Sequence, residues 1–404
     1  MPVWHKATQK WVADGKLVIL GITQEQHSDR CRLFAQWQQF SWPILWDPIN
    51  LLESAAVPIV VAIDEQGIVR STRPRIETFE QEFLNVTFRH DSAPPAEDAA
   101  VAESRRPQKP DLSVLRELAE QSKTARSYRD WADACVLWGG TSKIDAAIKA
   151  YKQSRQLNAD DANMLFRLGV AFRLRHDSDR RHAADFQTAV EHWEQALAKN
   201  PNQYIWRRRI QQYGPRLDKP YSFYDWVEQA RSEVVARGEI PIPLAVDPYG
   251  AELAHPVRSV TVTPRGEKSP DPDGKIQRDE DLLIQSEVTL VPSRVHPGES
   301  TRVHISFSPD AELKSHWNNE ADPLLVWADV PEGWQVSQQS HSMAGPENQP
   351  TSTEVRHCDF EVQVSATASG IIELPVYALY FVCEDASGTC LYLRQDIKVK
   401  IQID

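Results

Sequence analysis

The chain has 404 residues, which is enough for two or three domains that each bury a core of their own. Its 57 Asp and Glu residues outnumber 45 Lys and Arg residues, and the formal net charge of −12 argues against general nucleic-acid binding. Five cysteines are too few for a disulfide scaffold, and no apolar run in the sequence reaches the length that spans a membrane.

Residues 1–88 show an alternation of strand and helix signals. The continuous apolar run Leu17–Ile22 predicts a strand that is buried on both faces, and a helix is expected over residues 28–40. The step Val57-Pro58 then opens a second apolar run, because proline is tolerated at the first residue of a strand. The turn residues Asp64 to Gly67 predict a tight hairpin with a returning strand.

This order, with Val57-Pro58 followed by IVVAIDEQGIV, resembles the second half of a thioredoxin-fold redoxin, of the peroxiredoxin and thiol–disulfide reductase superfamily. The resemblance implies a cis Pro58 that lies against a reactive dithiol. The strand and cysteine-bearing loop that open such a fold have no counterpart after Met1, so we expect this chain to lack the redoxin nucleophile. The true N-terminus can lie upstream, and the compartment is therefore left open although no signal peptide is visible.

Cys31 is the one cysteine among residues 1–88 and lies between two arginines. Flanking cations favour a thiolate, so a reactive Cys31 is one interpretation. An inert cysteine on an amphipathic helix is the interpretation we favour.

Residues 89–112 are rich in Pro, Ala and charge and predict a linker, whereas residues 113–238 follow a helical period. The apolar set that begins at Ile144 recurs 42 positions later from Phe186, and each set precedes an Asn-containing break and another helix. This pattern resembles tetratricopeptide (TPR) repeats, with an insertion between the two units. An ordinary helical bundle is the alternative.

The first helices of such repeats line a concave groove, and residues 163–217 carry ten Lys and Arg against five Asp and Glu. Four arginines are candidates to receive an acidic peptide or a C-terminal carboxylate of a protein partner: Arg167, Arg173, Arg207 and Arg208. A solvated helix face explains the same residues without a ligand.

Residues 239–282 are again Pro-rich and predict a second linker. From residue 283 to 404 the apolar positions alternate with period 2, most clearly in the set Ile397, Val399, Ile401 and Ile403. Turn signals separate these runs. The pattern predicts an all-β sandwich of immunoglobulin-like type.

Cys383 and Cys390 stand at the two edges of a polar segment between apolar runs. Opposite positions of a hairpin lie at a Cα separation of about 4.5–5.5 Å, which suits a disulfide. Since Glu384 and Asp385 disfavour a nearby thiolate, we expect Cys390 to be the more reactive thiol. We interpret Cys135 as a packing residue and Cys358 as a surface residue.

The segment Tyr-x-x-Cys…Gly-x-Cys-Leu, in a terminal β-sandwich, resembles the N-terminal domain of bacterial transmembrane thiol–disulfide interchange proteins. The resemblance covers roughly residues 285–404 and implies a hairpin dithiol that passes electrons to partner proteins. A structural disulfide, or two reduced neighbours, is the alternative at this position.

The sequence thus predicts a thiol–disulfide redox-associated multidomain protein that combines three parts. These are a partial thioredoxin-like α/β domain, an all-α TPR-like scaffold and an immunoglobulin-like sandwich with a dithiol relay. The alternative is a non-enzymatic interaction scaffold with structural end domains. No glycine-rich phosphate loop or metal-ligand cluster is visible, so no cofactor, metal or nucleic acid is expected, and the partners would be proteins.

Overall fold

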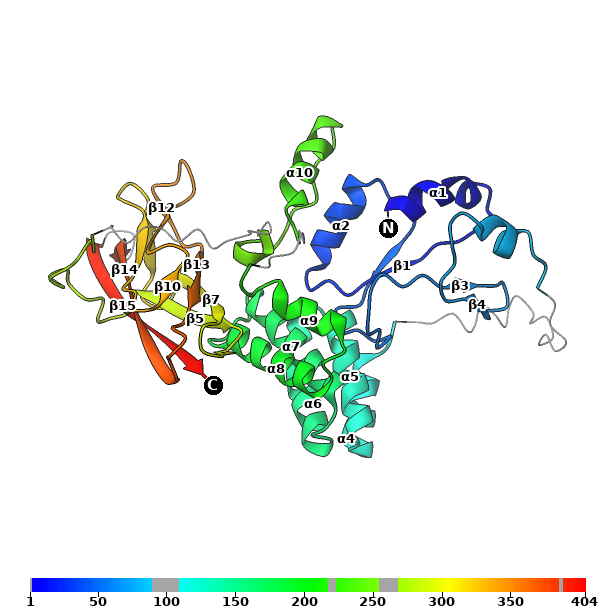
Figure 1. Ribbon diagram of the computed structural model, residues 1–404, viewed down its shortest axis with the longest axis horizontal. Helices are drawn as coiled ribbons and strands as arrows, with labels where there is room; N and C mark the ends of the chain where they lie inside the picture. The colour runs from blue at the N-terminus through cyan, green and yellow to red at the C-terminus, as the bar shows by residue number, and fades with distance from the viewer. Residues whose placement is uncertain (1, 89–108, 217–222, 254–267, 385–387) are drawn as a thin grey trace. The chain divides into compact units, whose positions relative to one another are not determined.

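The computed structural model describes residues 2–88, 109–216, 223–253, 268–384 and 388–404 (Figure 1). Contacts group the chain into two compact units. The first unit comprises residues 1–180, 195–207 and 226–247, and the second comprises residues 181–194, 208–225 and 248–404. The five-part division expected from composition stays a prediction, and its first linker lies almost entirely outside the described residues.

The N-terminal part of the first unit contains short elements: α1 (Pro2–Ala13), β1 (Gly21–Thr23), α2 (Ser28–Trp37), β2 (Ile44–Trp46), β3 (Ala62–Ile63), β4 (Val69–Ser71) and the π-helical turn η1 (Glu80–Leu84). β1 and β2 form a parallel pair, while β3 and β4 form an antiparallel hairpin. Asp64 closes the hairpin turn, because its carboxylate accepts the backbone N–H groups of Gln66 and Ile68. Gly67 adopts the positive φ of 81° that this turn requires.

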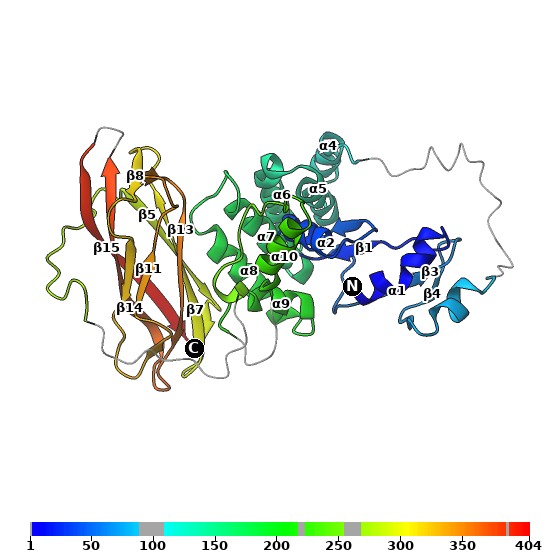
Figure 2. The ribbon, with the colours of Figure 1, turned by 90° about the horizontal axis from the view of Figure 1, so that it is seen from above.

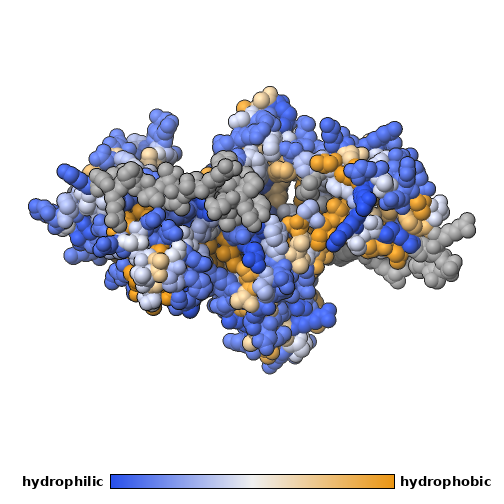
Figure 3. Space-filling model, viewed as in Figure 1, coloured by the Kyte–Doolittle hydropathy of each residue, from blue (hydrophilic) through white to orange (hydrophobic). Residues whose placement is uncertain are grey.

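The expectation of a strand buried on both faces at Leu17–Ile22 is wrong. Val18 is 88% exposed and Leu20 is 52% exposed, and the strand itself spans Gly21–Thr23. Burial on both faces requires elements that pack over each face of a sheet, and the exposed side chains of Val18 and Leu20 lack such cover. Apolar surface is accordingly visible over this part of the chain (Figure 3).

The helical region contains α4 (Leu112–Ser122), α5 (Ala125–Trp138), the 3-10 turn η2 (Thr141–Lys143), α6 (Ile144–Leu157), α7 (Ala162–His176), α8 (Asp185–Lys199), α9 (Tyr204–Gln211) and α10 (Trp226–Ala236). Each helix from α4 to α7 packs against the next in sequence. Thr124 and Asp161 cap α5 and α7 through side-chain oxygens that accept first-turn N–H groups. α8 and α9 contribute residues to both units.

Buried charges hold the first unit together. Arg167 on α7 donates to Asp133 on α5 at 2.6 Å, and the Tyr151 hydroxyl donates to the same carboxylate at 2.7 Å. Arg173, fully buried, donates to Asp177 at 3.0 Å. His27, which precedes α2, lies 3.7 Å from Asp177 and joins the N-terminal part to the helices.

The second segment that composition predicts as a linker is packed in its described parts, and its role as a linker stays a prediction. Gln36 on α2 donates to the Ile240 carbonyl and accepts the Ile242 N–H, both at 2.9 Å. The Asp29 carboxylate accepts the Ala245 N–H at 2.5 Å. Residues 240–245 are thus fixed by polar contacts to their backbone.

The second unit contains two sheets. Its elements are η3 (Gly250–Leu253), β5 (Ile284–Val291), β6 (Arg294–Val295), β7 (Ser300–Pro309), β8 (Ser315–Asn318), β9 (Leu324–Ala328), β10 (Gln335–Val336), β11 (Ser340–Met343), β12 (Thr351–Ser352), β13 (Arg356–Gln363), β14 (Gly370–Glu384) and β15 (Cys390–Ile403). The four-stranded sheet has the order β10-β13-β7-β5. The seven-stranded sheet has the order β11-β9-β14-β15-β6, and β8 pairs with both β12 and β14.

Side chains of both sheets form one core, with Phe307 and Phe360 from the smaller sheet and Trp317 from the larger. The alternation expected at the C-terminus is observed, since Ile397, Val399, Ile401 and Ile403 are buried. The long pair β14 and β15 runs through the larger sheet (Figure 2).

We predict that Arg167→Ala destabilises the first unit by about 3–5 kcal/mol, because it leaves the Asp133 carboxylate buried without its cation. The matched control is Arg116→Ala, since Arg116 is half-exposed and pairs with Glu120 at the surface of α4. That control is expected to cost less than about 1 kcal/mol. Urea unfolding of the two variants measures the difference, and equal midpoints would contradict the structural role of Arg167.

Candidate functional site

The β14–β15 hairpin brings the two candidate cysteines together. The register pairs Cys383 with Cys390, and the Cα atoms lie 4.0 Å apart. The two sulfur atoms form a disulfide. Asp385 lies outside the described residues.

The two cysteines differ in their access to solvent. Cys383 is only 2% exposed, whereas Cys390 is exposed at the start of β15. Attack on a disulfide requires a path to one of its sulfur atoms, and of this pair Cys390 is the residue that solvent reaches.

A histidine lies in the same row as the disulfide. Cys383 pairs with His316 of β8 on one side and with Cys390 on the other. Residues directly opposite one another in neighbouring strands point to the same face of a sheet, so these three side chains share a face. His316 also borders an open hollow of about 1680 Å³ between β8 and the segment 343–357.

The next row of this face is aromatic. Phe381 and Tyr392 are opposite one another in the register, and their rings stack with centroids 4.4 Å apart. The face is opposite to the sandwich core, because the intervening residues Tyr380 and Val382 are buried in that core. The aromatic pair therefore lies beside the disulfide on the outer face of the larger sheet.

Farther from the disulfide along β14 and β15, residues 268–282 cover the same face of the larger sheet. Ser269 contacts the hydroxyl of Tyr377 at 2.7 Å, and the guanidinium of Arg394 lies 3.8 Å from the ring centroid. Arg394 also donates to Asp271 at 2.8 Å. This is the second described part of the predicted linker, and it too is packed rather than free.

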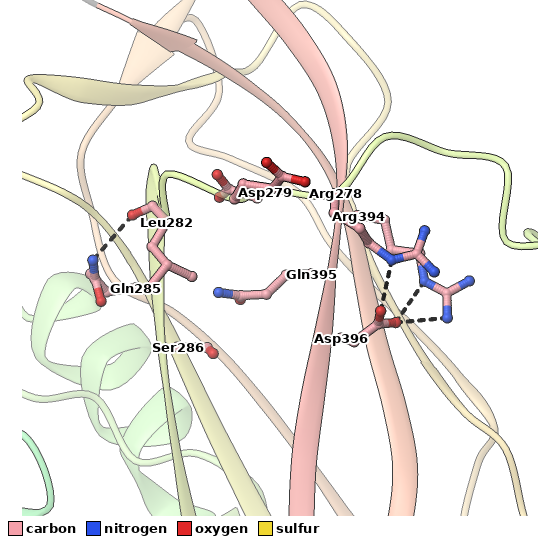
Figure 4. Close-up of a pocket in the computed structure, with 9 residues that line it drawn as sticks. Arg278, Asp279, Leu282, Gln285, Ser286, Arg394, Gln395 and Asp396 are labelled. Atoms are coloured by element: carbon pink, nitrogen blue, oxygen red, sulfur yellow. Dashed lines mark hydrogen bonds and ion pairs between the residues drawn. The ribbon is translucent and has the colours of Figure 1, made fainter.

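A hollow of about 490 Å³ opens where this segment meets β15 (Figure 4). Three of its five charged side chains are paired with one another. Asp396 accepts from Arg278 and from Arg394, and Figure 4 shows this carboxylate against both guanidinium groups. The hollow thus resembles a salt-bridged surface depression more than a ligand site.

The remaining cysteines are poor nucleophiles. Burial raises the pKa of the Cys31 thiol to about 12, and Glu25 adds to that increase despite the hydrogen bond from Thr23. Burial likewise raises the pKa of Cys135 and that of Cys358. Our interpretation of Cys358 as a surface residue is wrong, since it lies on β13 within the sandwich core.

The other candidate residues are distributed over both units. Pro58 follows a cis Val57–Pro58 peptide bond in the first unit, whereas the hairpin disulfide belongs to the second. The expected role of Pro58 beside a reactive dithiol stays a prediction.

The structure does not gather the four arginines in one exposed groove. Arg167 and Arg173 are buried with acidic partners of their own chain, which corrects the expected exposed placement of both. Arg207 is exposed and donates to the Pro201 carbonyl, and Arg208 lies over the ring of Phe223.

Within the described residues, no group of three or more His, Cys, Asp or Glu side chains is arranged to hold a metal ion. None of the helices in this part of the chain combines the length and the apolar content needed to cross a bilayer.

Sequence reasoning missed His316 and the Phe381–Tyr392 pair. Phe381 lies two residues before Cys383 and Tyr392 lies two residues after Cys390. The alternation of side chains along a strand therefore could have revealed this pair. His316 has no such signal, because β8 precedes β14 by a long stretch of chain.

Comparisons with known proteins add little. No family model matches the chain, and no curated protein matches it. Among solved structures, the ASH / PapD-like domain of human CEP192 (PapD-like domain 7) is similar at 11% sequence identity. The similarity covers 30% of this chain and 85% of that domain, with a TM-score of 0.16, a value too low to support an argument.

We predict that an alkylating reagent labels the folded, mildly reduced protein at Cys390 and leaves Cys31 and Cys358 unmodified between about pH 7 and 9. The raised pKa values keep both thiols protonated in this range, since a thiol ionises only as the pH approaches its pKa. Peptide mass mapping measures the labelling, and urea-unfolded protein, in which all five cysteines should react, is the control. Early modification of Cys31 in the folded protein would contradict this assignment.

Proposed function

We propose that the protein takes part in thiol–disulfide exchange through the Cys383–Cys390 pair, with Cys390 as the sulfur that partners attack. The observation that carries this proposal is the unequal access of the two sulfur atoms in one disulfide. A purely structural bridge has no need of an exposed member, whereas exchange needs a sulfur atom that a partner thiolate can reach.

The exchange has two steps in each direction. A partner thiolate bonds to the Cys390 sulfur, the Cys383–Cys390 bond breaks, and Cys383 departs as a thiolate that takes up a proton. A second partner thiolate then displaces Cys390 and forms the partner disulfide, so that two electrons and two protons reside on the pair. In the reverse direction the Cys390 thiolate attacks a partner disulfide and Cys383 resolves the mixed disulfide.

The finer fold assignments belong to the same proposal. Residues 1–88 are a partial thioredoxin-like redoxin domain, supported by the strand–helix order and by the cis Pro58. Residues 113–238 form TPR-like repeats, supported by consecutive helices that pack in sequence order. Residues 283–404 form an immunoglobulin-like sandwich, supported by two antiparallel layers around one core.

In this proposal the helical region binds a protein partner. Arg207 is the candidate arginine that is exposed, so it is the one best placed for a charged contact. The second candidate function is a non-enzymatic interaction scaffold. It is favoured by the raised thiol pKa values of Cys31, Cys135 and Cys358, which make three of the five cysteines poor nucleophiles.

Trapping distinguishes these functions. In Cys383→Ser the sulfur that resolves the mixed disulfide is absent, so we expect a disulfide-bonded probe such as oxidised glutathione to accumulate on Cys390. In the matched variant Cys390→Ser we expect at least about tenfold slower adduct formation, because the remaining thiol is buried. Intact-mass kinetics measures both. Equal rates for the two variants, or no adduct with either, would favour the scaffold.

A further inference from the structure

The edge of β15 next to the disulfide has backbone groups that pair with no other strand among the described residues. Arg394 shows which residues face this edge: its N–H donates to the Gln277 carbonyl at 2.8 Å, and its carbonyl accepts the Asp279 N–H at 2.9 Å. Both groups therefore point away from β14. Because the direction alternates with period 2, the N–H and carbonyl groups of Tyr392 and Cys390 point the same way.

The chain itself occupies only part of this edge. Arg278 forms a parallel bridge with Arg394, so residues 277–279 act as a short added strand. On the N-terminal side of this bridge, Ile276 packs against Trp327, Tyr377 and Leu379, so the segment passes over the outer face of the sheet rather than along the edge at Tyr392. Among the described residues, no backbone hydrogen bond joins another segment to the outer edge at Tyr392 or Cys390.

Side chains at this position leave the edge accessible. Tyr392 is 42% exposed and Cys390 is exposed, and the stacked Phe381 ring supports the tyrosine from the β14 side. An extended peptide that paired with Tyr392 would continue the strand that residues 277–279 begin. The peptide residue two positions from the one that pairs with Tyr392 would lie opposite Cys390. The Cα atoms of these two residues would be within the separation that a disulfide bridges.

We propose that the exchange partner docks by adding an extended, cysteine-containing segment to the free edge of β15 at Tyr392 and Cys390. The inference rests on the proposed exchange function and names the form of its partner. Backbone pairing supplies affinity that is largely independent of sequence, and the cysteine of the added strand meets the exposed sulfur.

Tyr392→Pro tests this docking. Proline removes the outward N–H but leaves the β14–β15 hydrogen bonds in place, because that N–H is not part of the ladder. Tyr392→Ala is the matched control, since it removes the ring and keeps the N–H. The probes are a blocked peptide Thr-Val-Cys-Val-Thr and the small thiol 2-mercaptoethanol, each reacted with the oxidised protein.

We expect the peptide to open the disulfide roughly three- to tenfold more slowly in Tyr392→Pro than in Tyr392→Ala, because one hydrogen bond to the edge is lost. The 2-mercaptoethanol rates should be equal in the two variants, since this thiol does not pair with a strand. Equal peptide rates in the two variants would overturn the docking proposal. A disulfide that neither probe opens would instead overturn the exchange function.

Hydrogen exchange gives a readout that does not depend on the proline variant. In the wild-type protein, a peptide with Ser in place of Cys should slow exchange of the Tyr392 amide, whereas the same peptide with N-methyl groups at alternate residues should not. An unchanged Tyr392 amide at saturating peptide would also overturn the proposal.

Discussion

The antiparallel ladder of β14 and β15 is the constraint on which the second unit depends. It runs in unbroken register from Gly370 opposite Ile403 to Cys383 opposite Cys390. This register decides which side chains enter the sandwich core and which form the outer face. It also determines that the two cysteines meet, that the aromatic pair lies beside them, and that alternate backbone groups of β15 face outward. A shift by one residue would exchange the two faces.

In the first unit, buried ion pairs are the comparable constraint on the arrangement of the helices. Burial alone would raise the pKa of Asp177, but Arg173 and the nearby histidines outweigh burial and hold that pKa below its ordinary value. The carboxylate therefore stays ionised and joins α7 to the loop before α2. Such pairs contribute specificity of arrangement more than net stability, because each charge loses its hydration on burial. They also explain why a count of arginines does not identify a binding surface.

Local patterns predicted the elements that depend on neighbouring residues. The period of the apolar residues located the helices and the alternating C-terminal strand, and the hairpin cysteines followed from turn chemistry. Burial was less predictable, because it depends on contacts between distant segments. Val18, Arg167 and Cys358 were each misplaced for this reason, and the alignment of His316 with the disulfide arises from pairing between remote strands. Composition did not indicate that residues 239–253 and 268–282 are anchored by side chains.

The outward direction of the Cys390 backbone groups places the disulfide in a pair of residues that exchange no ladder hydrogen bonds with each other. Breaking the disulfide therefore removes no hydrogen bond of the β14–β15 ladder. Opening the bond frees a very short loop, so the unfolded chain gains little entropy, and the neighbouring residue pairs keep the strands in place. Oxidised and reduced forms would then share one architecture, and electrons could be loaded and unloaded without any folding step in the cycle.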